Sequence, residues 1–241
     1  MPDKTRVVWP LFWYPPILAY HRVLPEERHD TPSLHPDRFA RQMQILAERF
    51  HPIPLAGLAD HLEGRGTLPA RPAVVTFDDG TDDLFTHAFP ILARFRIPAI
   101  IFLIVRNIGR PGSLSLPQIQ TMRQNGIDFG SHTLAHDYLP SIPLARAEES
   151  LSLSKQLLEE LGIPASFLSY PAGGYTPEIA QVAARIGYRA ACTTNRGSRR
   201  FPIDRWALRR VTMHRAASSA WGMRLCCSGY YGLNRRLRSP S

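Results

Sequence analysis

The sequence contains little cysteine, and the three cysteines suit neither a disulfide framework nor a zinc site. Among its 241 residues only Cys192, Cys226 and Cys227 carry a thiol. An odd number cannot pair completely within one chain, and two adjacent cysteines lack the spacing of zinc ligands. We interpret all three as free thiols, which favours a reducing compartment.

A clean signal peptide and a membrane-spanning segment are also missing. The apolar stretch over residues 7–20 is interrupted by Pro10, Pro15 and Pro16, and no small-residue cleavage site follows it. The stretch is too short to span a bilayer comfortably. We therefore expect an uncleaved start and a cytoplasmic or membrane-peripheral protein.

Acidic residues are scarce relative to basic ones, which gives a net charge of +9 and a sequence pI near 10.0. Such a balance favours anionic partners: glycans, a membrane surface or nucleic acid. No helix-turn-helix, zinc-finger or RNP-like signature accompanies the charge, so we expect no nucleic-acid partner. Peripheral membrane contact and a simple solvated, arginine-rich surface stay open.

No glycine-rich nucleotide loop follows any expected strand, although strand and helix patterns alternate along the chain. Amphipathic patterns predict helices over residues 35–50, 81–96, 115–126, 143–162 and 176–187. Short apolar runs predict strands at residues 16–21, 72–77, 97–105, 127–133, 165–173, 188–194 and 206–213. About seven such units predict one α/β domain with a parallel barrel.

Polar residues gather where the expected strands end. His21 follows the first strand, and Asp78 and Asp79 follow "PAVVTF". The segments "GSHTLAHDYL" (130–139) and "SYPAGGY" (169–175) follow two later strands. In parallel barrels the sites form at the C-terminal ends of the strands, so these groups are expected at one mouth.

The adjacent carboxylates of Asp78 and Asp79 are unfavourable by themselves, because like charges repel more strongly as a site loses water. His132 and His136 are four residues apart, and a helical segment after His132 would let both imidazoles share a metal ion. Two imidazoles and one carboxylate leave positions open for water. We interpret one aspartate as a ligand and the other as a base. The alternative is a turn and a helix N-cap.

Three motifs resemble, in order and approximate spacing, those of the polysaccharide deacetylases, the NodB-homology or carbohydrate esterase family 4 domain: "TFDDG" (76–80), "SHTLAH" (131–136) and "SYPAGG" (169–174). The early "AYHRV" and the late "LRRVTM" resemble the branch that deacetylates poly-N-acetylglucosamine. The resemblance implies a distorted (β/α)7 barrel. We expect an apolar and basic lead-in over residues 1–15, the deacetylase domain over 16–214 and a basic tail over 215–241.

The resemblance also implies roles for the site residues. Asp79, His132 and His136 would hold a divalent metal ion, usually Zn²⁺, although such a ligand set accepts Co²⁺, Ni²⁺ or Mn²⁺ as well. The metal would lower the pKa of water and polarise the acetamide carbonyl. Asp78 would be the general base, and a backbone N–H near Ala172 would help to stabilise the oxyanion.

Two departures from the family pattern concern charge and proton transfer. Ser169 stands where the family often has an arginine that orients the base, and Arg209 or Arg210 could supply that charge. The family's last motif, L-x-H, which provides the general acid, has no clear counterpart. His214 is the nearest candidate for that acid, and His21 is another. If neither lies near the metal, water or protonated Asp78 would donate the proton.

Substrate contacts are expected from the first strand end and the third motif: His21, Tyr170, Pro171, Ala172, Gly173 and Tyr175. The expected substrate is an N-acetylated glycan, which for this family suggests the cell envelope. Two alternatives stay open. One is hydrolysis of a small cyclic amide or ureide, and the other is a catalytically inactive glycan-binding domain.

Overall fold

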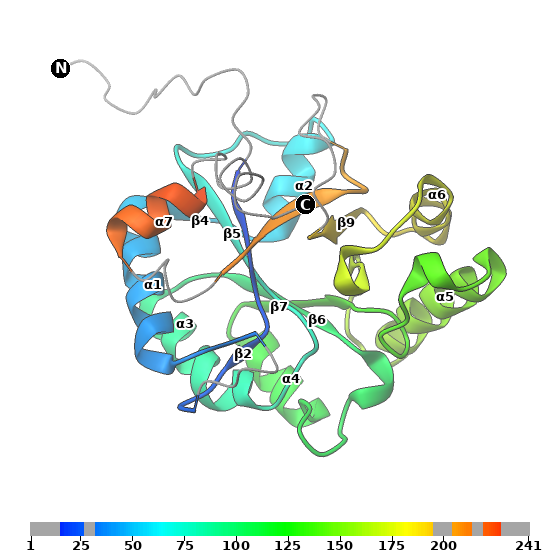
Figure 1. Cartoon of the computed structure of the whole chain (residues 1–241), viewed down its shortest axis with the longest axis horizontal. Coiled ribbons are helices and arrows are strands. Elements are labelled where there is room, and N and C mark those ends of the chain that lie inside the picture. The colour runs from blue at the N-terminus through cyan, green and yellow to red at the C-terminus, as the bar shows by residue number, and fades with distance from the viewer. Residues whose placement is uncertain (1–14, 27–31, 195–203, 214–218, 228–241) are drawn as a thin grey trace, which may run out of the picture.

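A computed structural model describes residues 15–26, 32–194, 204–213 and 219–227. Seven parallel strands close into a barrel within a single domain, which confirms the predicted (β/α)7 fold (Figure 1). The ring runs β1 (Ile17–Tyr20), β10 (Leu208–Thr212), β9 (Ala190–Thr193), β8 (Phe167–Ser169), β7 (Ile127–Ser131), β6 (Ala99–Leu103) and β5 (Pro72–Phe77), and β5 pairs with β1. A short strand, β4 (His51–Pro52), pairs with the first residues of β5. Strands β2 (Arg22–Val23) and β3 (Ser33–Leu34) form a separate parallel pair.

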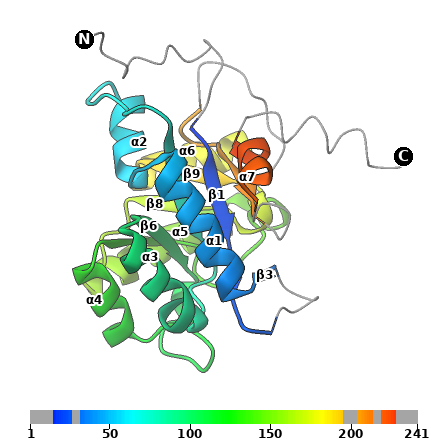
Figure 2. The same cartoon turned by 90° about the vertical axis from the view of Figure 1, so that its left-hand side faces the viewer.

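Helices surround the ring, as Figures 1 and 2 show: α1 (Pro36–Arg49), α3 (Phe89–Phe95), α4 (Leu116–Gln124), α5 (Leu144–Glu160) and α6 (Pro177–Ile186). The start of α6 follows from the sequence, because Thr176 accepts a hydrogen bond from the Ile179 N–H and so caps this helix. The helix expected over residues 81–96 differs. A π-helical turn, η1 (Leu84–Ala88), precedes α3, and Pro90 lies at the start of α3 because it has no N–H to donate within a helix.

The barrel interior is filled by apolar side chains, and helix α2 (Leu55–Leu62) closes one end of it. Leu55, Leu58 and Ala59 of α2 pack in the same buried cluster as Ile17 and Val74 of β1 and β5. Helix α2 directly follows β4, which pairs with the start of β5. It therefore covers the N-terminal end of the strands and leaves the C-terminal end for a site.

Charged side chains form ion pairs at the end of helix α2, where this helix covers the barrel. Arg189 pairs with Asp60 and Glu63 at 2.6 Å and 2.8 Å, and Arg205 pairs with Glu63 at 2.9 Å. These ion pairs connect the end of α2 to the segments that precede β9 and β10. They lie partly exposed to solvent, so each contributes modestly, but together they fix α2 against the barrel.

The described part of the expected tail contains helix α7 (Ala220–Cys227), which packs beside α1 (Figure 2). Met223, Cys226 and Cys227 are buried there. All three cysteines are free, as predicted. Burial raises the pKa of the Cys192 thiol to about 12, so this thiol stays protonated. No helix among the described residues is long and apolar enough to cross a membrane.

Gly130 of β7 tests how tightly the barrel is packed. An added Cβ would lie 2.7 Å from the Phe167 carbonyl oxygen and 2.9 Å from the Phe102 ring. Gly130→Ala should therefore lower the free energy of unfolding by about 1–3 kcal/mol. The matched control is Gly57→Ala in α2, where a Cβ meets nothing within 4 Å. That change should raise stability by up to about 1 kcal/mol. Urea denaturation of both variants checks the contrast, and equal shifts would contradict it.

Candidate metal and catalytic site

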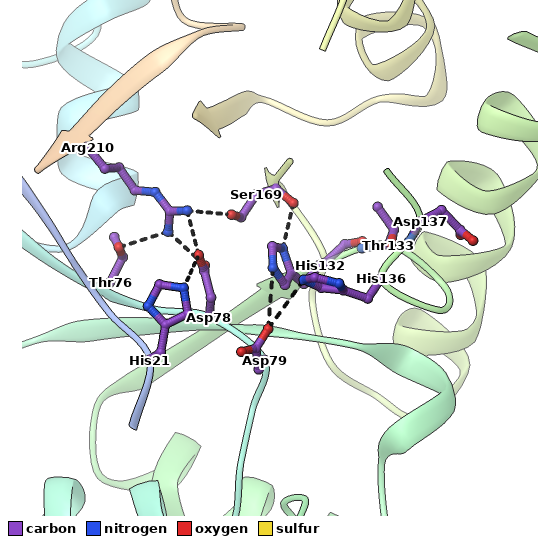
Figure 3. A network of polar contacts seen from close by, with 11 residues as sticks. His21, Thr76, Asp78, Asp79, His132, Thr133, His136, Asp137, Ser169 and Arg210 are labelled. Carbon is purple, nitrogen blue, oxygen red and sulfur yellow. Dashed lines mark hydrogen bonds and ion pairs between the residues drawn. The ribbon is translucent and has the colours of Figure 1, made fainter. Parts of the chain in front are cut away.

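Asp78 and Asp79 begin the turn that follows β5, and the backbone turns their side chains in different directions (Figure 3). The Asp78 N–H donates to the Tyr20 carbonyl, which extends the pairing with β1. Asp79 then adopts a left-handed conformation with φ 71°, and Gly80 follows with φ 68°. A Cβ on Gly80 would lie 2.5 Å from Leu103, so only glycine fits this turn.

The Asp78 carboxylate faces the guanidinium of a residue in β10, a strand that β1 separates from β5 in the barrel. Arg210 of β10 donates from Nη1 to Asp78 Oδ1 at 2.7 Å and from Nη2 to Oδ2 at 2.6 Å. Its Nη1 also donates to Thr76 Oγ1 at 3.2 Å, and its Nη2 to Ser169 Oγ at 2.8 Å. Arg210 and Asp78 are both buried, and the guanidinium lies 5.6 Å from the centre of the Phe102 ring. The pair is thus bidentate and sheltered from water.

The Arg210 pairing decides the charge of Asp78. Burial alone raises the pKa of a carboxyl group, and here it is the largest single influence. The positive charge of Arg210, together with its hydrogen bonds and the nearby histidines, outweighs burial and holds the pKa of Asp78 well below its usual range. Asp78 is therefore a carboxylate despite its buried position.

Asp79 lies on the other side of the turn, between two imidazoles (Figure 3). Its Oδ1 is 3.6 Å from His132 Nε2 and 3.6 Å from His136 Nε2. Donors that bind one tetrahedral ion at 2.0–2.2 Å lie roughly 3.3–3.6 Å apart. The three side chains offer ligand atoms that all lie within 4.8 Å of one another. The donor set therefore fits a divalent metal ion.

The orientation of His132 supports the same interpretation. Its Nδ1 lies 2.8 Å from the Ser169 carbonyl oxygen, which can only accept, so Nδ1 carries the proton. The lone pair of Nε2 then points toward Asp79 and is available to a metal. Burial lowers the pKa of His132. The negative charges of Asp78 and Asp79 act in the opposite direction, but the net shift is downward, which favours the neutral ring.

The segment between the two histidines is a tight turn and not the helix that their spacing suggested. Thr133 and His136 adopt left-handed conformations, with φ 65° and 63°. Side chains stabilise the turn: Ser131 Oγ accepts from the Thr133 N–H, and Thr133 Oγ1 accepts from the Asp137 N–H. The two imidazoles still meet, with ring centres 4.9 Å apart.

Backbone strain is concentrated at this mouth. Within the described part of the chain, six non-glycine residues have positive φ, and four of them belong to the site loops: Asp79, Thr133, His136 and Ala172. Such conformations cost free energy and persist where the surrounding structure enforces them, which is common at functional sites. The strained residues are therefore consistent with side chains held in a set geometry.

The other expected site residues occupy varied positions. His21 lies near the carboxylate, with Nε2 3.9 Å from Asp78 Oδ2. Just beyond it, Asp83 accepts hydrogen bonds from Arg22 Nε at 2.9 Å and from the Val23 N–H at 2.8 Å, which fixes the chain after His21. His214 lies outside the described residues.

The third motif forms a 3₁₀ turn, η4 (Pro171–Gly173), after β8. Pro171 and Gly173 are buried there, whereas Ala172 is exposed. Tyr170 is fully buried and stacks on the half-buried Tyr175, with ring centres 5.1 Å apart. The Tyr170 side chain therefore serves packing, and Ala172 and Tyr175 are the members that solvent reaches.

Sequence patterns missed Thr76 and the double role of Ser169. Thr76 Oγ1 donates to the Leu18 carbonyl and accepts from Arg210, so it supports the guanidinium. Ser169 contacts Arg210 through its hydroxyl and His132 through its carbonyl. The sequence indicated Arg210 only as one of two arginines that could supply the missing charge, because its pairing with Asp78 depends on how the strands are arranged in the barrel.

A family model for polysaccharide deacetylases matches residues 65–191, which is more than half of the chain. The chain belongs to the polysaccharide deacetylase family. Family membership makes it a hydrolase, and the matched region contains Asp78, Asp79, His132 and His136. Arg210, which pairs with Asp78, lies beyond it.

Individual relatives agree with this assignment. YxkH of Bacillus subtilis, named as a polysaccharide deacetylase, is 29% identical over 210 residues, covering 86% of this chain and 74% of YxkH. A poly-β-1,6-N-acetyl-D-glucosamine N-deacetylase of Staphylococcus epidermidis is 38% identical over 79 residues, covering 30% of this chain and only 27% of that enzyme.

Two solved structures share the fold over most of both chains. The Streptococcus pyogenes deacetylase PplD, in complex with acetate, aligns with a TM-score of 0.79 at 26% identity, covering 87% of this chain and 96% of that one. IcaB from Ammonifex degensii aligns with a TM-score of 0.77 at 27% identity, covering 86% and 95%.

Removing the guanidinium tests the buried pair of this deacetylase. Arg210→Met would leave Asp78 buried without a counter-charge, so the free energy of unfolding should fall by about 3–5 kcal/mol. The pKa of Asp78 should rise, because burial then acts unopposed. Chemical denaturation gives the stability. The control is Arg146→Met, since Arg146 is exposed and its ion pair is with exposed Glu149; the stability of this variant should hardly change. Equal stability of the two variants would contradict the role of the pair.

Proposed function

We propose that this deacetylase removes N-acetyl groups from amino-sugar residues of a polysaccharide or glycolipid, by metal-dependent hydrolysis with Asp78 as general base. One observation carries the proposal. At a single strand end, one carboxylate is paired with Arg210 while its neighbour faces two imidazoles. This arrangement supports separate roles for the two aspartates, with Asp78 as the base and Asp79 as a metal ligand.

Asp79, His132 and His136 are proposed to hold the metal ion, with Zn²⁺ as the expected ion and Co²⁺, Ni²⁺ or Mn²⁺ as alternatives. A divalent cation bound there would lower the pKa of water and polarise the acetamide carbonyl. The Ser169 carbonyl keeps His132 in the tautomer that this role needs.

Asp78 is proposed to accept the proton from the attacking water. The bidentate contact with Arg210 keeps it ionised and fixes its orientation. Arg210 therefore supplies the positive charge that the family often places at the Ser169 position. Ser169 itself carries no charge, and its hydroxyl accepts a hydrogen bond from Arg210.

The leaving nitrogen needs a proton when the carbon–nitrogen bond breaks. Of the two candidates for the general acid, we propose His21, because it lies at the same mouth with Nε2 facing Asp78. The products are then acetate and a free amino sugar. Ala172 is proposed to place its N–H toward the oxyanion, because it is the exposed residue of the third-motif turn.

The proposed substrate is a polymer of N-acetylglucosamine, because one relative is named for deacetylating poly-β-1,6-N-acetyl-D-glucosamine. That relative matches only part of this chain, so peptidoglycan, chitin-like oligomers and lipid-linked sugars belong in the same test. A cell-envelope location, which such substrates suggest, stays a prediction.

The test is acetate release from N-acetylglucosamine oligomers and peptidoglycan, before and after chelation and with Zn²⁺ added back. Release should stop with chelator and return with metal. Metal content by mass spectrometry should fall in Asp79→Ala and His136→Ala. Release that persists in metal-free protein would contradict metal dependence. No release from any glycan by metal-loaded protein would redirect the search to small amides or to glycan binding.

Two variants separate the proposed proton-transfer groups from the metal ligands. Asp78→Asn and His21→Asn should each lower kcat by about 100-fold or more, because each removes a proton-transfer group. Both should keep their metal. Normal turnover in His21→Asn would exclude His21 as the acid.

A further inference from the structure

Tyr138 is a large aromatic side chain that the proposed chemistry leaves unused. It follows the metal-ligand turn, two residues after His136, and 48% of its surface is exposed. Its neighbour Leu139 is fully buried and anchors the chain in an apolar cluster. Ser141 donates two hydrogen bonds to the Tyr138 carbonyl, from its N–H at 3.0 Å and from its hydroxyl at 2.8 Å. The backbone of Tyr138 is therefore held while its ring stays at the surface.

The ring rests directly on another site loop. Gly174, just after the third-motif turn, is buried, and a Cβ there would lie 2.2 Å from a carbon of the Tyr138 ring. The ring therefore lies against bare backbone, in a space that only glycine leaves open. Thr193 Oγ1 of β9 donates to the Gly173 carbonyl at 2.7 Å and supports the same loop from below.

This placement joins the two loops that border the proposed reaction centre. One loop carries His136, and the other carries exposed Ala172 two residues before Gly174. The Tyr138 ring lies against the second loop at Gly174, while 48% of the residue's surface is exposed to solvent. Tyrosine suits such a surface, because its ring is apolar and its hydroxyl can exchange hydrogen bonds with a polar ligand.

We propose that Tyr138 is a platform for the sugar unit next to the one that loses its acetyl group. A β-linked glucosamine ring has an apolar face of C–H groups that can stack on an aromatic ring, and its hydroxyls lie at the rim. Tyr138 would then select chains of at least two sugar units over single sugars. The inference rests on the proposed function and deepens it.

The test compares turnover of N-acetylglucosamine and of its β-1,6-linked oligomers by Tyr138→Ala, Tyr138→Leu and Tyr138→Phe. In Tyr138→Ala the KM for oligomers should rise roughly three- to tenfold, while kcat and turnover of the monosaccharide stay unchanged. Tyr138→Phe should keep most of the affinity. Tyr138→Leu still covers Gly174 but lacks a flat ring, so it should behave like alanine. The control is Leu157→Ala, an exposed apolar residue of α5, which should match the wild type.

Two results would overturn the platform. One is an unchanged KM for oligomers in Tyr138→Ala. The other is an equal loss on the monosaccharide and the oligomers together with lost metal, which would show that Tyr138 only supports the loops. Calorimetric binding of the same oligomers tests the platform without turnover, and an absence of Tyr138-dependent binding overturns it. Binding that depends on Tyr138 without acetate release would instead contradict the proposed function.

Discussion

The buried ion pair between Arg210 and Asp78 is the interaction on which the site depends. A buried carboxylate is unstable without a partner, and a buried guanidinium is equally so. Arg210 lies in β10 and Asp78 directly follows β5, and both of these strands pair with β1. The pair therefore forms only when the barrel is closed, and closure and the charge of Asp78 are parts of one arrangement. This explains how an ionised carboxylate can lie beneath the surface of an apolar barrel.

The side of the site formed by Asp79, His132 and His136 depends on strained turns. Asp79 and His136 have left-handed backbones, and His132 is held through the Ser169 carbonyl. Ser169 thus joins the two halves, since its hydroxyl contacts Arg210 and its carbonyl contacts His132. The strain is supported by the packed interior, which α2 closes at the opposite end. The packing of α2 at the N-terminal end of the strands thus helps to offset the strained backbone conformations at the C-terminal end.

The sequence predicted the barrel well, because buried strands and amphipathic helices have distinct periodicities and the polar groups fall at strand ends. It did not predict α2, a short helix that contains Gly57, or the π-helical turn before Pro90. The spacing of His132 and His136 was compatible with a helix. The segment is a turn with left-handed residues at Thr133 and His136, and hydrophobic periodicity does not predict such a turn. Contacts across the barrel could not be read from order alone. The pairing of Arg210 with Asp78 and the contact of the Tyr138 ring with Gly174 can be seen only in the folded structure.

The two adjacent aspartates are proposed to have separate roles. The most direct test is a crystal structure of the protein grown with Zn²⁺, with anomalous scattering recorded at the zinc edge. We expect one strong peak bounded by Asp79 and the Nε2 atoms of His132 and His136, with Asp78 still paired to Arg210. A peak ligated by Asp78 with Arg210 displaced, or zinc bound elsewhere with none at this cluster, would contradict these separate roles.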